Sequence, residues 1–305
     1  MVSSAFHEGE RDVQRRAGVE TEASRLAGML SPPQLEGGMA KFLKQRNLAF
    51  VTARDSAGRL WTSALCGERG FLHGQGSSLT VEAAPQSPDP LHGLKPGQPI
   101  GLLTIDLAIR RRVRVNGLLT ISRPGLLQID ADQAFGNCPS YIQQRVLEPV
   151  AHDRADDGPG VQEIADSVLS AEHERLIRRA DTFFLGTTHP QRGADSSHKG
   201  GNPGFVRVEN GVIWWPDYAG NNLFNSLGNI AVDPDAALLF IDFASGGLLQ
   251  LSGRAELEWL VPGAAGDDGG TGRRVRFHPQ HVRAGTAELR GADVAFSPHN
   301  PALAG

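Results

Sequence analysis

A long internal repeat is the feature that most constrains the fold of this chain. Segment 63–71 reads SALCGERGF and segment 197–205 reads SHKGGNPGF, so that a Ser, two Gly and a Phe coincide. Subtracting 63 from 197 gives an offset of 134 residues. Segments 101–106 (GLLTID) and 237–242 (ALLFID) match at an offset of 237 minus 101, or 136 residues. The two matching blocks are therefore separated by an insertion of only two residues (136 minus 134).

An offset of this length is the size of a small domain, whereas solenoid repeats span about 20–50 residues. Two similar domains in one chain can pack as the two subunits of a symmetric dimer do, and such an interface commonly holds a ligand. Where the halves differ in sequence, one ligand site is expected to be kept and its counterpart lost.

The composition is that of a globular protein without a strong charge bias. Hydrophobic residues make up 40%, charged residues 21%, and the formal net charge is −4. Neither a nucleic acid nor a membrane surface is therefore expected as the main partner. Two cysteines, Cys66 and Cys138, make no disulfide framework, which favours a reducing, cytoplasmic location. Residues 1–25 lack the apolar centre of a signal peptide, and no apolar run reaches the roughly 20 residues of a membrane helix.

Short apolar runs between turns rich in Gly and Pro predict a mainly β protein with a few helices. Strands are expected over 47–54, 60–66, 79–84, 99–107, 113–121, 126–129, 182–187, 195–199, 204–209, 212–216, 236–243, 248–259 and 273–282. Helices are expected over 11–30, 35–45, 135–147, 170–179 and 222–233. Small antiparallel barrels would hide the strand edges, although periodicity alone does not distinguish a barrel from a sandwich.

The same pattern divides the chain into four parts. Residues 1–34 are interpreted as an N-terminal extension, 35–150 as the first repeat, 151–169 as a linker, and 170–305 as the second repeat. The linker is charged and contains Gly and Pro, which is typical of a domain boundary.

The second repeat contains two polar stretches that are candidates for ligand binding. Residues 216–222 (PDYAGNN) follow an apolar strand and precede a helix, so backbone N–H groups at the helix start form an anion site. A plain turn with an Asn cap explains the same residues without a ligand. In 197–201 (SHKGG), strand alternation places Ser197 and Lys199 on one side and His198 on the other. Lys199 is either a phosphate contact or a solvated surface residue.

The first repeat has no counterpart of the 216–222 turn but carries a basic strand. Arg112, Arg114 and Asn116 share one face of it, and the two cations repel each other unless an anion or an acid meets them. A ligand phosphate bound across the interface and pairing with Asp or Glu are both consistent with this pattern. The stretch 135–143 (FGNCPSYIQ) is placed either over a cofactor or in a packing helix between the domains.

Several common chemistries have no signature here. The sequence has no Walker A loop, no HExxH and no Gly-x-Ser-x-Gly motif. His278 and His281 have no nearby Cys or acid in the sequence to complete a ligand set, so no metal site is predicted. No pair of residues is assigned as general acid and base.

The spaced combination of 195–206 (DSSHKGGNPGFV), 216–222 (PDYAGNN) and 226–230 (SLGNI) resembles the pyridoxamine 5′-phosphate oxidase-related FMN-binding proteins. Residues 238–243 and 251–255 continue the resemblance, which is strong over about 180–260 and weaker over 40–125. It implies two tandem split β-barrels that form an intramolecular pseudo-dimer and hold flavin mononucleotide (FMN) at their interface.

The resemblance also implies which residues meet the cofactor. The flavin phosphate and ribityl chain are expected at Ser197, Lys199, Asn221 and Asn222, and the full predicted site adds His198, Asp217, Tyr218, Arg112, Arg114 and Asn116. The oxidase itself has an Arg-Lys pair where this chain has Asn221-Asn222, and its C-terminal Arg/Trp signature is not evident here. Pyridoxamine phosphate is therefore not the expected substrate.

The sequence thus predicts one FMN per chain and an FMN-dependent oxidoreductase with an unidentified small-molecule substrate or redox partner. Two alternatives stay open: a flavin-binding or electron-transfer module without turnover, and a binder of another planar cofactor such as haem or a deazaflavin. The pseudo-dimer within one chain leaves room for a homodimer of whole chains.

Overall fold

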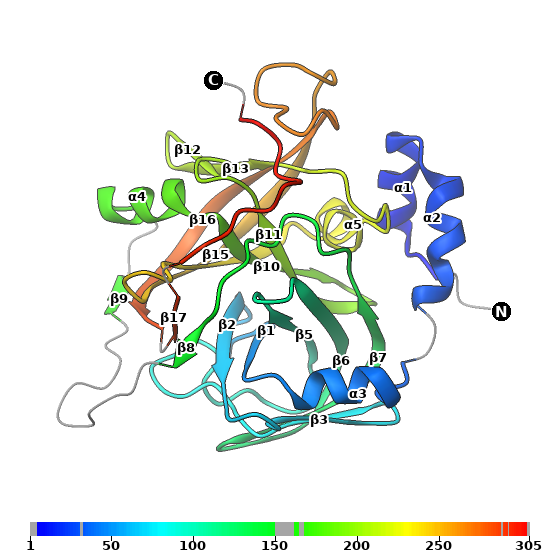
Figure 1. Ribbon diagram of the computed structural model, residues 1–305, viewed down its shortest axis with the longest axis vertical. Helices are drawn as coiled ribbons and strands as arrows, with labels where there is room; N and C mark the ends of the chain where they lie inside the picture. The colour runs from blue at the N-terminus through cyan, green and yellow to red at the C-terminus, as the bar shows by residue number, and fades with distance from the viewer. Residues whose placement is uncertain are drawn as a thin grey trace.

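The computed structural model describes residues 5–30, 33–149, 162–164, 168–287, 289–291 and 293–303 (Figure 1). Two antiparallel sheets with short helices around them dominate the architecture. The sheets pack against each other across the middle of the molecule, with the first repeat below and the second above in the view of Figure 1.

The first sheet has seven strands in the order β2-β1-β5-β6-β7-β4-β3. Their bounds are β1 (Leu48–Arg54), β2 (Leu60–Cys66), β3 (Leu72–Gln75), β4 (Ser78–Val81), β5 (Pro99–Asp106), β6 (Arg111–Arg123) and β7 (Leu126–Gly136). The sheet curls around its core, and because the edge strands β2 and β3 do not pair with each other, the barrel is split. That core includes the buried side chains of Val51, Trp61, Leu102 and Val115.

The second sheet has the main order β11-β10-β14-β15-β16-β13-β12, and the short strand β9 (Gln162–Ile164) pairs with β16. Its strands are β10 (Thr182–His189), β11 (Gly193–Gly200), β12 (Arg207–Glu209), β13 (Val212–Pro216), β14 (Asp235–Ile241), β15 (Gly247–Trp259) and β16 (Arg273–Thr286). Replacing β1–β7 by β10–β16 converts the first order into the second. The predicted fold class, mainly β with two tandem split barrels, is therefore confirmed.

The two repeats are related by an approximate two-fold axis. The rings of Phe50 on β1 and Phe184 on β10 stack with centroids 3.4 Å apart. Subtracting 50 from 184 gives 134, so these two residues are counterparts in the repeat. A residue contacts its own counterpart only close to a two-fold axis, as in a symmetric dimer. The predicted intramolecular pseudo-dimer is thus present.

Alternation along β1 and β10 explains how each strand serves two cores. Val51 and Leu185 face the interior of their own barrels, while Phe50 and Phe184 face the other barrel. Successive side chains of a strand point to opposite faces, so a strand with two apolar neighbours must be apolar throughout. The interface core is completed by the apolar side chains of Leu48, Leu103, Ile105, Leu239, Ile241 and Phe243, among others.

Short helices lie around the two sheets. They are α1 (Glu8–Ala17), α2 (Glu20–Leu26), the 3-10 helix η1 (Ala27–Leu30), α3 (Gly37–Lys44), α4 (Ala171–Arg179) and α5 (Asn225–Val232). The predicted start of α4 is confirmed, because Ser170 Oγ accepts a hydrogen bond from the backbone N–H of His173 (3.2 Å). The helix predicted over 11–30 is broken at Gly18, which adopts a left-handed conformation. None of the described helices has the length and apolar character needed to span a bilayer.

The helix predicted over 135–147 is wrong. Strand β7 continues to Gly136, and residues 137–147 follow an irregular path without a helix. Tyr141 has a φ of +64°, which a helix does not allow. Backbone groups of the segment find distant partners instead: Ile142 O accepts from Arg110 Nε (3.0 Å), and Gln144 N donates to Ala295 O (2.9 Å).

The segment ends in β8 (Glu148–Pro149), which pairs with β17 (Leu289–Arg290) of the C-terminal region. Most of the linker predicted over 151–169 lies outside the described residues.

Candidate functional site

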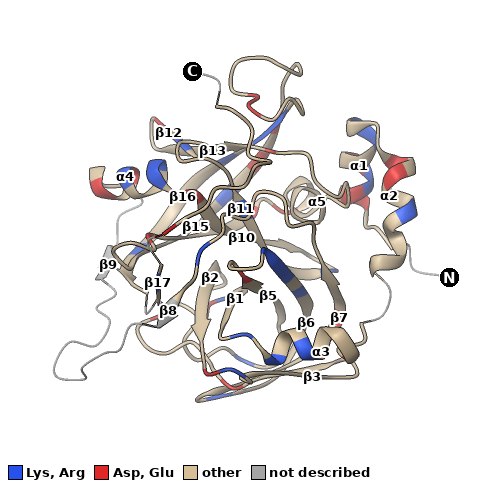
Figure 2. Ribbon diagram, in the orientation of Figure 1, with Lys and Arg blue, Asp and Glu red and all other residues tan. Residues whose placement is uncertain are grey.

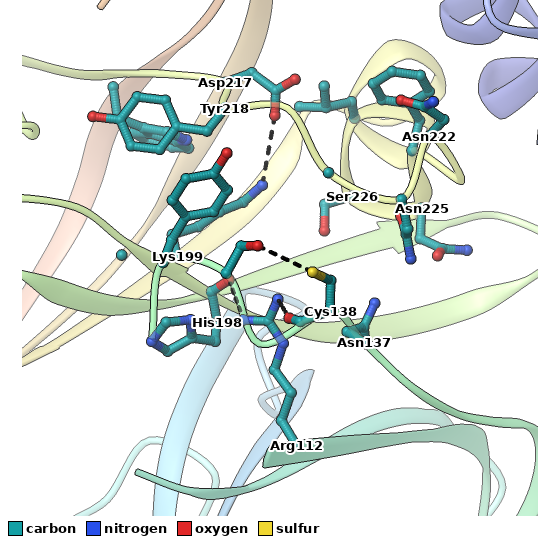
Figure 3. Close-up of a pocket in the computed structure, with 18 of the residues that line it drawn as sticks. Arg112, Asn137, Cys138, His198, Lys199, Asp217, Tyr218, Asn222, Asn225 and Ser226 are labelled. Carbon is teal, nitrogen blue, oxygen red and sulfur yellow. Dashed lines mark hydrogen bonds and ion pairs between the residues drawn. The ribbon is translucent and has the colours of Figure 1, made fainter. Parts of the chain in front are cut away.

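A pocket lies at the junction of the two repeats (Figure 3). Its volume is about 880 Å³ when the open solvent at its mouth is included. Strand β6 and the segment after β7 line it from the first repeat, and β11, β13 and the start of α5 line it from the second. Its polar and aromatic lining residues are Arg112, Arg114, Asn137, Cys138, Ser140, Tyr141, His198, Lys199, Phe205, Trp215, Asp217, Tyr218, Asn221, Asn222, Phe224, Asn225 and Ser226.

One buried carboxylate joins the two repeats beneath the pocket. Asp195 of β11 accepts from Arg114 Nη1 (3.1 and 3.2 Å) and from Asn116 Nδ2 (3.0 Å), both on β6. It also accepts from Ser197 Oγ (3.0 Å) and Ser226 Oγ (3.2 Å). Of the two explanations for the basic strand, a ligand phosphate or an acidic partner, the second holds for Arg114 and Asn116. No feature of the sequence near Asp195 indicates this role.

Two other cations of the pocket lack such full compensation (Figure 2 shows the basic band on β6 beside β11). Arg112 donates to three neutral acceptors, His198 Nδ1 (2.7 Å), His198 O (3.4 Å) and Cys138 O (3.1 Å), and has no carboxylate partner among the described residues. Lys199 Nζ lies 3.9 Å from Asp217 Oδ1, and the Oδ2 of the same carboxylate accepts from Arg273 Nε (3.0 Å). A single Asp217 carboxylate therefore faces two cations, which leaves the pocket with an excess of positive charge.

Burial strengthens this preference for an anion. It lowers the pKa of Lys199, an effect that Asp217 partly opposes. Burial, and then the neighbouring Arg114, also lower the pKa of Arg112. A lowered pKa means that the charged form has lost solvation which the protein does not replace in full. An anionic ligand would supply the missing interaction and favour the charged forms.

His198 is held as a neutral ring with one defined tautomer. Burial, and then Arg112, keep its pKa well below the ordinary value. A guanidinium only donates, so Nδ1 must accept from Arg112, and the neutral ring carries its hydrogen on Nε2. Neither ring nitrogen then presents a free lone pair to a metal ion or a haem iron.

Buried polar atoms without a hydrogen-bond partner gather around the pocket. Of the 15 such side-chain atoms among the described residues, 7 belong to residues that line it. They are Arg112 Nε, Arg114 Nε, Asn137 Oδ1, His198 Nε2, Trp215 Nε1, Tyr218 Oη and Asn221 Nδ2. Most are N–H donors, and each buried unpaired group costs about 1–3 kcal/mol. An acceptor-rich ligand would satisfy donors that the protein itself leaves unpaired.

The turn between β13 and α5 has the backbone of a specialised loop. Asn222 and Phe224 have φ values of +60° and +59°, in the left-handed region that residues other than Gly rarely adopt. Asn221 Oδ1 accepts from the backbone N–H of Leu223 (3.2 Å), which holds the turn. Backbone strain of this kind concentrates at ligand sites, where surrounding contacts maintain it. The helix predicted over 222–233 begins only at Asn225, after this turn.

Two tyrosines form an aromatic side of the pocket. The rings of Tyr141 and Tyr218 lie 5.0 Å apart at an angle of 46°, and Tyr141 Oη donates to Ala219 O (2.8 Å). Tyr141 belongs to the irregular segment after the first barrel, whereas Tyr218 follows β13 of the second. The segment that was predicted to lie over a cofactor therefore reaches the pocket, although it is not helical.

Eight of the ten predicted site residues line this one pocket: Arg112, Arg114, His198, Lys199, Asp217, Tyr218, Asn221 and Asn222. Ser197 and Asn116 do not line it and lie behind it, bound to Asp195. The expected alternation on β11 is confirmed, because His198 contacts Phe184 on the interface side (centroids 5.9 Å apart) while Lys199 reaches toward Asp217.

Sequence reasoning missed part of the pocket. Asn225 and Ser226 at the start of α5 and Trp215 at the end of β13 also line it. Ser226 was visible within the resembling stretch 226–230, but nothing local indicated that its side chain faces the pocket.

The symmetry-related position in the first repeat has lost this chemistry. Equivalent strand registers place Ala64 and Leu65 where the pocket has His198 and Lys199. On the neighbouring strand, Leu248 and Gln250 stand in the positions of Arg112 and Arg114. The cations and the buried imidazole thus have no counterparts.

The carboxylate at this symmetry-related position is paired internally. Asp89, in the loop that the first repeat has in place of the turn, accepts from Ser63 Oγ (2.7 Å) and Gln250 Nε2 (3.3 Å).

The structure also brings His7, Glu8 and His189 together. His7 Nδ1 accepts from Gly9 N, and His189 Nδ1 accepts from two backbone N–H groups, so both neutral rings carry hydrogen on Nε2. These hydrogens meet Asn229 Oδ1 (3.1 Å) and Glu8 Oε1 (3.2 Å). Hydrogen bonds account for the cluster, which offers a cation no free imidazole lone pair.

Comparison with known proteins gives only weak similarities. No family model matches the chain, and no curated protein matches it. Among solved structures, a Lactobacillus delbrueckii protein provisionally assigned as a pyridoxamine 5′-phosphate oxidase is 15% identical, with a TM-score of 0.33 over 39% of this chain and 97% of its own. The haem storage protein HutZ of Vibrio cholerae is 12% identical, with a TM-score of 0.30 over 39% and 97%. An FAD-binding protein of Mycobacterium smegmatis is 15% identical, with a TM-score of 0.28 over 38% and 96%. With scores this low, function must be inferred from the residues of this chain.

Proposed function

We propose that this chain is a flavoprotein that binds one FMN in the pocket between its two repeats and acts as an oxidoreductase. The observation that carries the proposal is the gathering of unpaired N–H donors around Arg112 and Lys199 in a single pocket. FMN has the matching chemistry, since it combines a phosphate, a hydroxylated chain and a planar ring with several acceptors.

Each part of the pocket has a role in this proposal. Lys199, Arg112 and the turn around Asn221 would hold the phosphate and the ribityl chain by charge-assisted and neutral hydrogen bonds. Tyr141 and Tyr218 would contact the planar ring system. When bound, the flavin would supply the redox chemistry, and the protein would supply position, electrostatics and access. A small-molecule substrate or redox partner would reach it through the open mouth.

The tautomer of His198 separates the proposal from one of its alternatives. A haem iron bound through His198 would need a free imidazole lone pair, whereas here Arg112 occupies Nδ1 and Nε2 carries the hydrogen. The cations and N–H donors of the pocket suit a phosphate, which favours FMN over a cofactor without one. A flavin carrier without turnover would use the same contacts, so the substrate remains the part of the proposal that requires an activity screen.

The lost counterpart site sets the stoichiometry. Because Ala64, Leu65, Leu248 and Gln250 are all uncharged, the symmetry-related position has no second set of cations. We therefore propose one FMN per chain. The proposal also keeps the division of the chain into an N-terminal extension and two repeats, and a cytoplasmic location, as predicted from the sequence.

Titration of the full chain with FMN and with riboflavin tests the proposal. Loss of the Lys199 ammonium should remove about 1.5–3 kcal/mol, the usual value for a hydrogen bond to a charged group, or roughly ten- to a hundred-fold in affinity. Lys199→Ala and Arg112→Ala should thus weaken FMN binding while hardly changing that of riboflavin, which has no phosphate. Lys95→Ala, at an exposed lysine of the first repeat, is the matched control.

Saturation at one equivalent of FMN and a flavin absorption spectrum are the expected results for the wild-type chain. Equal losses of FMN and riboflavin affinity would mean that the phosphate lies elsewhere. Saturation at two equivalents would show that the first repeat has kept a site, and a Soret band in the purified protein would reject the flavin assignment.

A further inference from the structure

The N-terminal helix α1 packs directly on α5, the helix whose first residues line the pocket (Figure 1). A side chain at Gly9 would place its Cβ 2.2 Å from Gly228 O, and one at Gly228 would place its Cβ 2.6 Å from Glu10 N. The two helices therefore touch backbone to backbone, and both positions exclude any side chain. Contact this close requires the relative position of α1 and α5 to be well defined.

Three hydrogen bonds connect α1 and its N-cap residue to α5 and the turn before it; together with the Gly9–Gly228 contact they form what we term the α1–α5 seam. Glu10 Oε1 accepts from Asn225 Nδ2 (2.6 Å), and Gln14 Nε2 donates to Leu223 O (3.3 Å). His7 Nε2, which carries the ring hydrogen, donates to Asn229 Oδ1 (3.1 Å). Glu10 is only 2% exposed, and its Oε2 also accepts from the backbone N–H of His7 (2.9 Å). Both carboxylate oxygens are thus engaged, and the helix is attached to the strained turn as well as to α5.

The seam reaches the pocket at two points, Asn225 and the turn before it. Asn225 lines the pocket and is bound to Glu10 on its far side. The neighbouring Leu223 carbonyl, held by Gln14, lies between Asn222 and Phe224, the two residues in the left-handed region. A turn in this conformation persists only when surrounding contacts maintain it. Helix α1 supplies contacts in the middle of that turn, at Leu223, and at its end, at Asn225.

We infer that helix α1 is a positioning element of the ligand site: Glu10 orients Asn225, and the α1–α5 seam holds the 221–225 turn in its binding conformation. Undocking of α1 lowers the affinity for the ligand. By linkage, the bound ligand stabilises the docked helix to the same extent. The inference concerns regulation of the site and rests on the proposed function only for the identity of the ligand.

Three neighbouring positions provide the test in the full chain. Gly9→Ala drives a methyl group into Gly228 O, and Glu10→Ala removes the acceptor for Asn225. Arg11→Ala changes an exposed residue of the same helix and is the control. The first readout is hydrogen–deuterium exchange without ligand in peptides covering 221–232, with peptides from β1 as a check that the first barrel stays folded. The second readout is the FMN dissociation constant.

We expect faster exchange over 221–232 in Gly9→Ala and Glu10→Ala but not in Arg11→Ala. FMN affinity should fall about fivefold or more in the first two variants, in line with the usual strength of coupling between linked sites. FMN should also slow exchange over 8–17 in the wild-type chain. Glu10→Gln, which keeps an acceptor for Asn225, should recover part of the lost affinity.

Two results would overturn the inference: exchange over 221–232 that matches the wild type in both variants, or faster exchange with FMN affinity unchanged within twofold. Absence of FMN binding by the wild-type chain would instead refute the proposed function. In that case, faster exchange over 221–232 in the seam variants alone would still support control of the pocket turn by α1.

Discussion

Replacement of Asp195 by Asn is the sharpest test of how the two repeats are held together. The change preserves the size of the side chain and removes its charge. In the wild-type chain the carboxylate accepts bonds from Arg114 and Asn116 of the first repeat and from Ser197 and Ser226 of the second. The side chains of Asp195 and Arg114 are only 3% and 9% exposed, so water cannot replace the lost partner.

The expected cost follows from this burial. Breaking a buried ion pair by removing one partner costs about 3–5 kcal/mol, because an uncompensated charge is left inside the protein. That is a large share of a typical folding free energy of about 5–15 kcal/mol. A change of 1 kcal/mol shifts Tm by about 2–4 °C in chains of 150–250 residues. For this chain the lower end of that range applies, and Asp195→Asn should lower Tm by about 6–10 °C.

Urea and thermal unfolding, followed by circular dichroism and tryptophan fluorescence, measure this effect. Asp12→Asn is the control, because Asp12 and Arg15 form an exposed pair (side chains 51% and 63% exposed) whose loss should cost less than about 0.5 kcal/mol. Combining Asp195→Asn with Arg114→Met should recover most of the loss, since the buried charge is then removed as well. A cost below about 1 kcal/mol, or a double variant no more stable than Asp195→Asn, would refute this account of the interface.

Three further predictions concern the pocket and α1. Burial lowers the pKa of Lys199, so FMN binding should weaken as the pH rises through a value below the ordinary lysine pKa of about 10.4. Lys199→Arg should retain FMN binding to higher pH, with riboflavin binding measured in parallel as the control. Cys138 lines the pocket and is exposed, so saturating FMN should slow its alkylation by iodoacetamide while leaving that of the exposed Cys66 unchanged; equal rates would place the ligand elsewhere. Burial raises the pKa of Glu10 to about 7, above its unfolded value of about 4.3. The stability that Glu10 contributes is therefore complete below about pH 4.3 and is lost as the pH rises through about 7. The stability difference between the wild type and Glu10→Gln in thermal unfolding should therefore decrease from pH 5 to pH 8, and an increase would contradict the burial argument.

Features that depend on local pattern could be predicted from the sequence. The β1–β2 hairpin follows from two apolar runs around Asp55 and Gly58, and the start of α4 follows from Ser170 as its cap. The offsets of 134 and 136 residues determined that the chain holds two equivalent domains, because similar sequences fold alike and pack with approximate symmetry. The Lys199 strand and the 216–222 turn could be assigned to one site because the resemblance links them.

Other features are contacts between residues far apart in the chain, and only the tertiary structure decided them. Nothing near Arg114 in the sequence indicates that its partner is Asp195, 81 residues away, rather than a ligand. The segment 137–147 has a helical pattern, yet Gln143 binds the C-terminal region and the segment takes an irregular path to the pocket. The same holds for α1, whose Glu10 meets Asn225 across 215 residues. A local pattern specifies which face of a strand or helix is apolar, but the partner of a buried charge is set by the packing of whole elements, which no short segment encodes.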